Sequence, residues 1–318
     1  MKTQNILLTL ILSFSLFTFA QEKLTTSTEA PAASVAPRWK ADVSSYFYNF
    51  QGTRASEKAD YGFENATLAM QLFGLQYQYS PAWTFSIMGQ HLNNYVETRL
   101  MNTYVKDRTT GLGDTMVTGI TPLYASSQVL VLGHIGASLP TGNINQKNIN
   151  NPIQDSNYAY NMQNGSGTFD TVTGLTTLVF QGNTQIGSHL SGIFRNGRNS
   201  NGYALGNQYR ADAWLDYNTK MGLTPRLVGY YKHKDAVQGW DEKYERNREN
   251  EAFMGFYEFY HHNQINWDVS AALKYSQAMG PATVAIEAGV PLAQNSSNFD
   301  NAAVSTEYYG MLNVSGQF

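Results

Sequence analysis

The chain has 318 residues, a formal charge of −3 and no cysteine. The absence of cysteine excludes disulfides and thiolate metal sites, and the near-neutral charge gives no electrostatic footprint for a nucleic-acid partner. Only 14% of the residues are charged, whereas 21 are Tyr, 16 are Phe and 27 are Gly, a composition compatible with a β-barrel that has lipid-facing aromatic side chains.

The first twenty residues are typical of a secretory signal peptide. Lys2 precedes an uncharged run of 14 residues from Ile6 to Phe19, and Thr18-Phe19-Ala20 forms a cleavage site before Gln21. The alternative, an uncleaved membrane anchor, needs about 20 apolar residues. We therefore expect export to the bacterial envelope with cleavage after Ala20. Residues 21–38, rich in Thr, Ser, Ala and Pro, are predicted to be a flexible periplasmic lead-in.

Residues 39–318 predict an all-β fold, a transmembrane antiparallel up-and-down β-barrel of about twelve strands. Most of the segments that read as strands are longer than the five or six residues usual in globular proteins and are long enough to cross a bilayer at a tilt. They are residues 39–50, 64–79, 82–95, 112–124, 127–138, 168–181, 184–196, 208–219, 224–234, 263–277, 281–293 and 306–318. Counts of ten or fourteen strands stay open, because 114–124 and 169–180 do not divide cleanly into two faces and 251–260 fits either a strand or a loop.

The connections alternate between short and long. Those after even-numbered segments are tight, as at Ser80-Pro81 and Gly182-Asn183, whereas those after odd-numbered segments are long and polar. The long ones are residues 51–63, 96–111, 139–167 and 235–262. Bacterial barrels have short periplasmic turns and long external loops, so the alternation supports a barrel with both termini in the periplasm.

Several segments show two faces. Trp83, Phe85 and Ile87 alternate with Thr84 and Ser86, and the last strand has an apolar face that ends on Phe318. The apolar faces are expected to meet lipid and the polar faces the lumen. Aromatic residues beside the short turns predict a girdle at the inner interface: Tyr79, Trp83, Tyr124, Phe180, Tyr217, Tyr275 and Phe318.

The same alternation predicts which charged side chains line the lumen. Such charges either pair across neighbouring strands or line a wet pathway and set ion preference, and their mixed signs favour pairing. The predicted lumen-lining residues are Arg210, Asp212, Asp216, Arg226, Lys232, Asp268, Lys274 and Glu287, with Glu307 as a further member.

No constellation predicts a catalytic residue, a cofactor or a metal site. His134 and His189 fall on inward faces and His261-His262 lie beside a long loop, but no spacing requires them to converge with carboxylates. Some twelve-stranded barrels are phospholipases with Ser, His and Asn at the lipid face, for which His189, Ser200 and Asn201 are the nearest candidates here. His189 faces inward, however, and a serine without an adjacent base is only a hydroxyl.

Two long loops are rich in polar residues. Residues 143–164 contain many Asn, Gln and Tyr, and residues 241–250 are dense in charge. Loops of this kind are either solvated external segments or plugs that fold inward and constrict the pore.

Three Gly-rich motifs occur in an order that resembles one family. They are Gly111-Leu112-Gly113-Asp114, Ser138-Leu139-Pro140-Thr141-Gly142-Asn143 and Asn164-Gly165-Ser166-Gly167-Thr168-Phe169-Asp170. Over residues 40–318 the chain resembles the MetA-pathway of phenol degradation family of outer-membrane barrels, often labelled transporters. The resemblance implies passage of small molecules, aromatic or hydrophobic ones included. Within the motifs, Asp114 and Asp170 are expected to cap turns through nearby backbone N–H groups.

We therefore expect a monomeric outer-membrane barrel that acts as a passive channel or transporter for small molecules. The alternative is a non-transporting barrel, either a structural or adhesion element or a lipid-active enzyme. The expected partners are outer-membrane lipid, a small-molecule solute and the barrel-assembly machinery, which would recognise the C-terminal strand ending in Phe318.

Overall fold

The computed structural model describes residues 39–52, 61–100, 103–147, 157, 158, 160, 162–241, 263–297 and 304–318. The predicted signal peptide, the lead-in, residues 242–250 and His261-His262 lie outside the described residues. Within the described residues, no helix is long and apolar enough to cross a bilayer.

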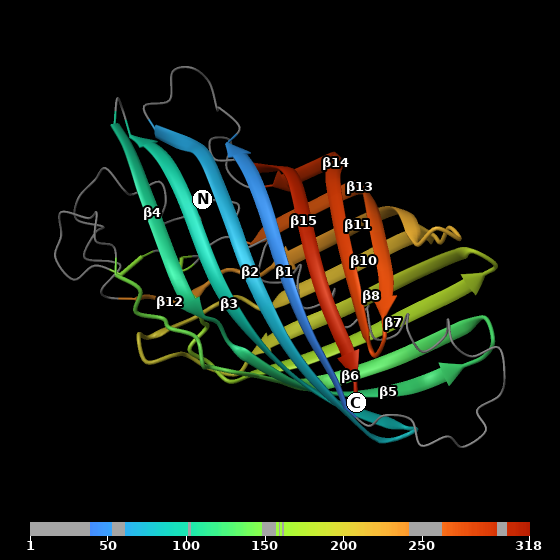
Figure 1. Cartoon of the computed structure of the whole chain (residues 1–318). Coiled ribbons are helices and arrows are strands. Elements are labelled where there is room, and N and C mark those ends of the chain that lie inside the picture. The colour runs from blue at the N-terminus through green and yellow to red at the C-terminus, as the bar shows by residue number, and fades with distance from the viewer. Residues whose placement is uncertain are drawn as a thin grey trace.

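The chain forms long antiparallel strands joined in sequence order (Figure 1). The barrel strands are β1 (Trp39–Gly52), β2 (Tyr61–Ser80), β3 (Trp83–Leu100), β4 (Thr103–Leu112), β5 (Thr115–Ala125), β6 (Val129–Leu139), β7 (Asp170–Gln181), β8 (Thr184–Arg195), β10 (Gln208–Tyr217), β11 (Leu223–Lys234), β13 (Gln264–Met279), β14 (Ala282–Ser297) and β15 (Val304–Gln317). Two short strands, β9 (Tyr203–Ala204) and β12 (Gln238–Gly239), pair with each other outside this sheet.

The sheet closes into a barrel because β1 pairs with both β2 and β15, and β2 also pairs with β3. β4 and β5 together occupy one position, since β5 pairs with residues 84–88 of β3 and β4 pairs with residues 91–100. The result is a closed antiparallel barrel of twelve positions, which confirms the predicted fold class. In Figure 1 the short turns lie on the right and the long connections on the left.

The predicted loop over residues 96–111 is wrong in part. Most of this segment forms the hairpin of β3 and β4, along which β3 is also paired with β2 as far as Leu100. The β-branched residues Thr103, Val105, Thr109 and Thr110 favour an extended backbone, but their alternation with charged residues reads as a polar loop. Gly113 and Asp114 separate β4 from β5.

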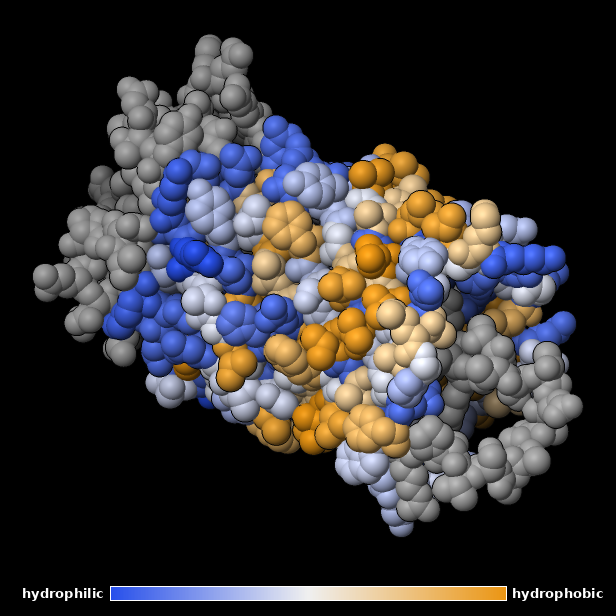
Figure 2. Space-filling model, in the orientation of Figure 1, coloured by the Kyte–Doolittle hydropathy of each residue, from blue (hydrophilic) through white to orange (hydrophobic). Residues whose placement is uncertain are grey.

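The outer surface carries the apolar side chains. Trp83, Phe85 and Ile87 are 38%, 47% and 51% exposed, whereas the alternate residues Thr84 and Ser86 are buried. Figure 2 shows the outward apolar residues gathered in a band, with hydrophilic residues at the end that carries the long connections. Such a band is the surface that meets the hydrocarbon core of a bilayer.

Aromatic residues surround the short-turn end, with one correction to the predicted girdle. Phe180 faces inward, where it packs against a cluster that includes Leu178 and Trp214. It sits two residues from the buried Leu178, and residues two apart on a strand share a face. The remaining predicted girdle residues are exposed: Tyr79, Trp83, Tyr124, Tyr217, Tyr275 and Phe318.

Candidate functional site

Large apolar side chains, here called the apolar wall, line the inner face of β1, β2, β3 and β5 toward the long connections. They come from neighbouring strands and are buried inside the barrel. The apolar wall comprises Tyr46, Tyr48 and Phe50 on β1, Leu68, Met70 and Leu72 on β2, Met88, Leu92 and Val96 on β3, and Met116 on β5. A wall of aromatic and methionine side chains is uncommon in a water-filled pore, whose interior is polar.

Most of the buried charged side chains line the inner face of β10, β11, β13 and β14, here called the charged wall. The structure places all eight predicted residues there, each less than 9% exposed. The charged wall comprises Arg210, Asp212 and Asp216 on β10, Arg226, Lys232 and Lys234 on β11, Asp268 and Lys274 on β13, and Glu287 on β14. Glu307 differs, because its side chain is exposed near the end of β15, where it accepts a hydrogen bond from Asn49.

Arg226 joins three strands through its guanidinium group. It donates two hydrogen bonds to Asp216, at 2.6 and 2.7 Å, and one to Glu287 at 3.1 Å. The residue opposite Arg226 on β13 is Ala272, and this small side chain leaves room for the guanidinium to reach β14. Tyr309 donates a further hydrogen bond to Glu287. A bidentate pair with additional donors is the arrangement that offsets the cost of burying charges.

The neighbouring row of charges is less completely paired. Arg210 donates to Asp212 on its own strand, and its guanidinium lies 4.9 Å from the centre of the Tyr230 ring. Its Nη1 atom, however, has no hydrogen-bond partner within the described residues, and neither has the Nζ atom of Lys232. Arg210 and Lys232 are directly opposite each other in the β10–β11 register.

The connection between β6 and β7 (residues 140–169) is here called the plug loop, and described residues of it lie inside the barrel. Tyr158 and Met162 are buried and belong to the same cluster as the apolar wall. The Tyr158 hydroxyl donates to Asp107 on β4. Burial, reinforced by the Asp107 carboxylate, raises the pKa of Tyr158 to about 12, so the phenol stays a donor at neutral pH. The described part of this loop therefore acts as a plug and is not a solvated external segment.

Both ends of the plug loop are tied to one carboxylate. Asp114 accepts hydrogen bonds from the backbone N–H of Gly142 at 3.0 Å and of Ser166 at 2.7 Å. Gly142 and Gly165 meet so closely that a Cβ on Gly142 would lie 2.5 Å from the Cα of Gly165. The three Gly-rich motifs thus converge at Asp114, which bonds N–H groups distant in sequence and not those of its own turn.

A second carboxylate holds the return of the plug loop to β7. Asp170 accepts hydrogen bonds from the hydroxyls of Ser166 and Thr168 and forms an ion pair with Arg195, its partner in the β7–β8 register. Its described partners are therefore side chains and not the predicted backbone N–H groups.

Three long connections meet above the lumen at Asp241. Its carboxylate accepts hydrogen bonds from Asn157 of the plug loop and from Asn201 of the β8–β10 connection. The rings of Tyr160 and Tyr203 lie 4.5 Å apart beside it. The plug loop is therefore held from above as well as at its two ends.

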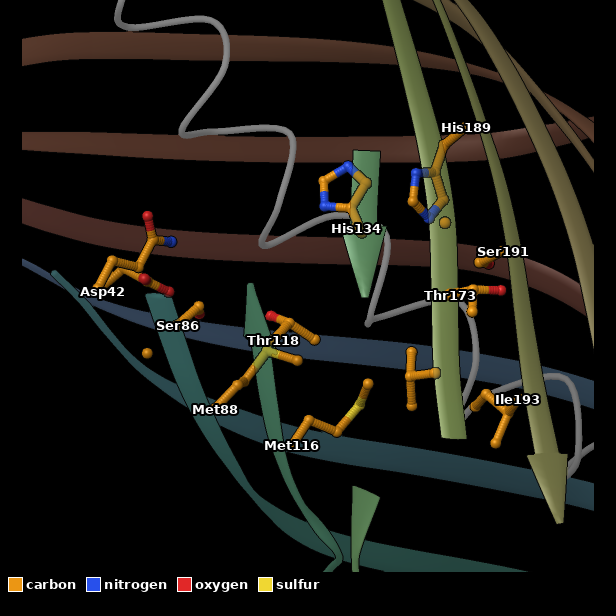
Figure 3. Close-up of a pocket in the computed structure, with 14 residues that line it drawn as sticks. Asp42, Ser86, Met88, Met116, Thr118, His134, Thr173, His189, Ser191 and Ile193 are labelled. Carbon is orange, nitrogen blue, oxygen red and sulfur yellow. The ribbon is translucent and has the colours of Figure 1, made fainter. Parts of the chain in front are cut away.

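Below the plug loop lies a cavity of about 40 Å³ (Figure 3). Met88, Met116, Val172 and Ile193 form an apolar side, and the remaining lining is polar, including Asp42, His134, His189 and Ser191. A cavity of this volume holds a water molecule or two.

The two inward histidines are bridged by a threonine. Thr176 lies 2.8 Å from Nε2 of His134 and 2.8 Å from Nδ1 of His189. Ser200 is exposed in the connection after β8, and Asn201 binds Asp241. The structure therefore does not bring His189 and Ser200 together as nucleophile and base.

A closed barrel with an apolar outer band, aromatic residues at its rim and an inward loop defines the class of transmembrane β-barrels found in bacterial outer membranes. No protein-family model matches the sequence, and no curated protein matches it.

Comparison with solved structures agrees with this class. The COG4313 outer-membrane channel from Pseudomonas putida F1 is 13% identical, with a TM-score of 0.57 over 91% of this chain and 100% of that one. The NanC porin is 12% identical, with a TM-score of 0.45 over 87% of this chain and 100% of the porin. At such identities the likeness to the COG4313 channel shows the fold alone.

Proposed function

We propose that the protein is an outer-membrane channel for small solutes, with aromatic or hydrophobic molecules among them. The observation that carries the proposal is the division of the lumen into an apolar wall and a charged wall. A pore for ions and sugars needs a polar lining alone, whereas a continuous apolar wall offers favourable contact to a hydrocarbon or aromatic ring.

The plug loop gives the proposed channel a gate. Its described contacts with the wall are hydrogen bonds and apolar packing, and the Asp114 carboxylate bonds both of its ends. Hydrogen bonds to a charged group contribute about 1.5–3 kcal/mol each, so movement of the loop on the millisecond scale is physically accessible. Passage through the channel would then require displacement of Tyr158 and Met162 from the apolar wall.

Family membership, recognition by the assembly machinery and a non-enzymatic role are proposed as well. The order of the three Gly-rich motifs supports membership of the MetA-pathway of phenol degradation family. Recognition of the last strand, which ends in Phe318, by the barrel-assembly machinery is a second proposal. The backbone hydrogen bonds between Trp39 and Phe318, which close the barrel seam, support it. A non-enzymatic role is supported by the separation of His189 from Ser200.

Proteoliposome swelling tests the proposal. Vesicles that contain the folded barrel are diluted into iso-osmotic solutions of arabinose or of sodium benzenesulfonate, neither of which crosses a lipid bilayer readily. We expect swelling in the aromatic solute at a rate above that in the sugar. Exclusion of both solutes by folded protein, with the plug loop intact and after its release by Asp114→Ala, would favour a non-transporting barrel.

A further inference from the structure

The upper part of the charged wall contains donors without acceptors. Lys232 is fully buried, at 0% exposed, and within the described residues its Nζ has no hydrogen-bond partner. The Nη1 atom of Arg210, which is opposite Lys232 in the strand register, also has no hydrogen-bond partner within the described residues. A buried cation without a partner costs several kcal/mol, so Lys232, with one unbonded guanidinium nitrogen of Arg210 beside it, calls for an acceptor.

Within the part of the chain that the structure describes, no carboxylate lies opposite this pair in the strand register. In the β8–β10–β11–β13 register, Arg210 and Lys232 are flanked by Ser191 on one side and Asn266 on the other. Besides Arg210, two further cations, Lys234 and Arg195, add positive potential at Lys232. The acid nearest to Arg210 along its strand, Asp212, is already bound through the Nε and Nη2 atoms.

The cavity in Figure 3 borders the same row of residues. Ser191 lines the cavity and is the β8 partner of Arg210, and the cavity floor is formed by Met88, Met116 and Ile193. Figure 3 shows Asp42 at the opposite side of the cavity from Ser191, which would orient an anion away from Asp42. Methionine side chains adapt readily, so this small cavity can widen around a ring.

We propose that Arg210 and Lys232 form a lumenal site for the carboxylate of a small amphipathic organic anion, whose apolar body packs against Met88, Met116, Val172 and Ile193. The proposal rests on the channel function above and names its solute class. The charge-assisted hydrogen bonds hold the carboxylate, and the apolar side of the cavity distinguishes an aromatic acid from an inorganic anion.

Isothermal titration of the folded barrel in detergent at pH 8 tests this site. The probes are benzoate, its neutral analogue benzyl alcohol, and sulfate as an inorganic anion. We expect wild-type protein to bind benzoate more tightly than either of the others. Lys232→Met should weaken benzoate binding by at least about tenfold, the loss of one charged hydrogen bond. Lys232→Arg should retain binding, and Lys220→Met, which removes a charge from an exposed turn, should leave it unchanged.

A second readout does not depend on binding. Because Lys232→Met removes an unpartnered buried charge, the variant should unfold at a higher urea concentration than wild type in the absence of ligand. Equal benzoate affinity in wild type and Lys232→Met would overturn the proposal, as would equal affinity for benzoate and benzyl alcohol, or for benzoate and sulfate. Bilayer recordings of wild type and of Asp114→Ala separate the two claims: current without benzoate preference overturns this site alone, and absence of current in both proteins overturns the channel.

Discussion

At the residue scale, charge placement inside the barrel follows from strand alternation. The pattern of alternate residues predicted the burial of Arg226 and Glu287 because a period of two fixes the face of each side chain once the strand is in register. The exceptions are local. Glu307 lies near the open end of β15, next to an irregularity of the β1–β15 register at Asn49 and Phe50, and alternation no longer guarantees burial there.

The Arg226 network makes a stability prediction with a matched control. Glu287→Gln leaves part of the buried guanidinium charge uncompensated, so we expect a loss of about 3 kcal/mol in the free energy of unfolding. Glu307→Gln makes the same chemical change at an exposed position and should alter it by less than about 0.5 kcal/mol. Urea unfolding in micelles, followed by tryptophan fluorescence, measures both. Equal losses in the two variants would show that the contact of Glu287 with Arg226 stabilises the barrel no more than an exposed contact does.

At the element scale, strands were predictable and the plug loop was not. Strand identity follows from residues i and i+2, whereas the path of residues 140–169 depends on contacts such as that of Tyr158 with Asp107, 51 residues apart. The Gly-rich motifs were visible in the sequence, but their convergence on Asp114 required the barrel to be closed. The motifs that contain Asp114, Gly142 and Ser166 could therefore be recognised in the sequence, but the contacts among them could not be predicted.

Asp114 provides a direct test of the plug. Asp114→Ala removes the acceptor for the N–H groups of Gly142 and Ser166, so the loop should leave the lumen more often and single-channel conductance should rise severalfold. Asp235→Ala, which removes a half-exposed carboxylate bound to His233, should leave the conductance at the wild-type level. If both variants conduct like wild type, Asp114 does not hold a gate.

The contact between Gly142 and Gly165 offers an independent test on the same element. Gly142→Ala places a methyl group against the Gly165 backbone, which should displace the plug loop and make it more sensitive to limited proteolysis. Gly89→Ala is the control, because a Cβ at Gly89 meets nothing within 4 Å. Protease resistance should be unchanged in that variant. Unchanged resistance in Gly142→Ala would contradict the tight packing at this crossing.

At the scale of the whole molecule, the barrel has an apolar outer surface and a lumen that carries both apolar and charged side chains. Its outside is apolar as the bilayer requires, while its inside carries the apolar wall on β1, β2, β3 and β5 and the charged wall on β10, β11, β13 and β14. Strand alternation and the order of short and long connections predicted a barrel, with which the many aromatic residues and glycines are compatible. The division of the lumen emerged only from strand order, which sets β1, β2 and β3 on one side and β10, β11 and β13 on the other.

Single-channel recording in planar bilayers tests the central claim most directly. We expect folded wild-type protein to give discrete current steps of low conductance, because the plug loop narrows the lumen. Asp114→Ala should give larger steps. Folding is verified on the same sample by resistance of the barrel to denaturation in cold detergent. Folded protein that passes no current, both as wild type and as Asp114→Ala, would contradict the assignment of the barrel as a channel.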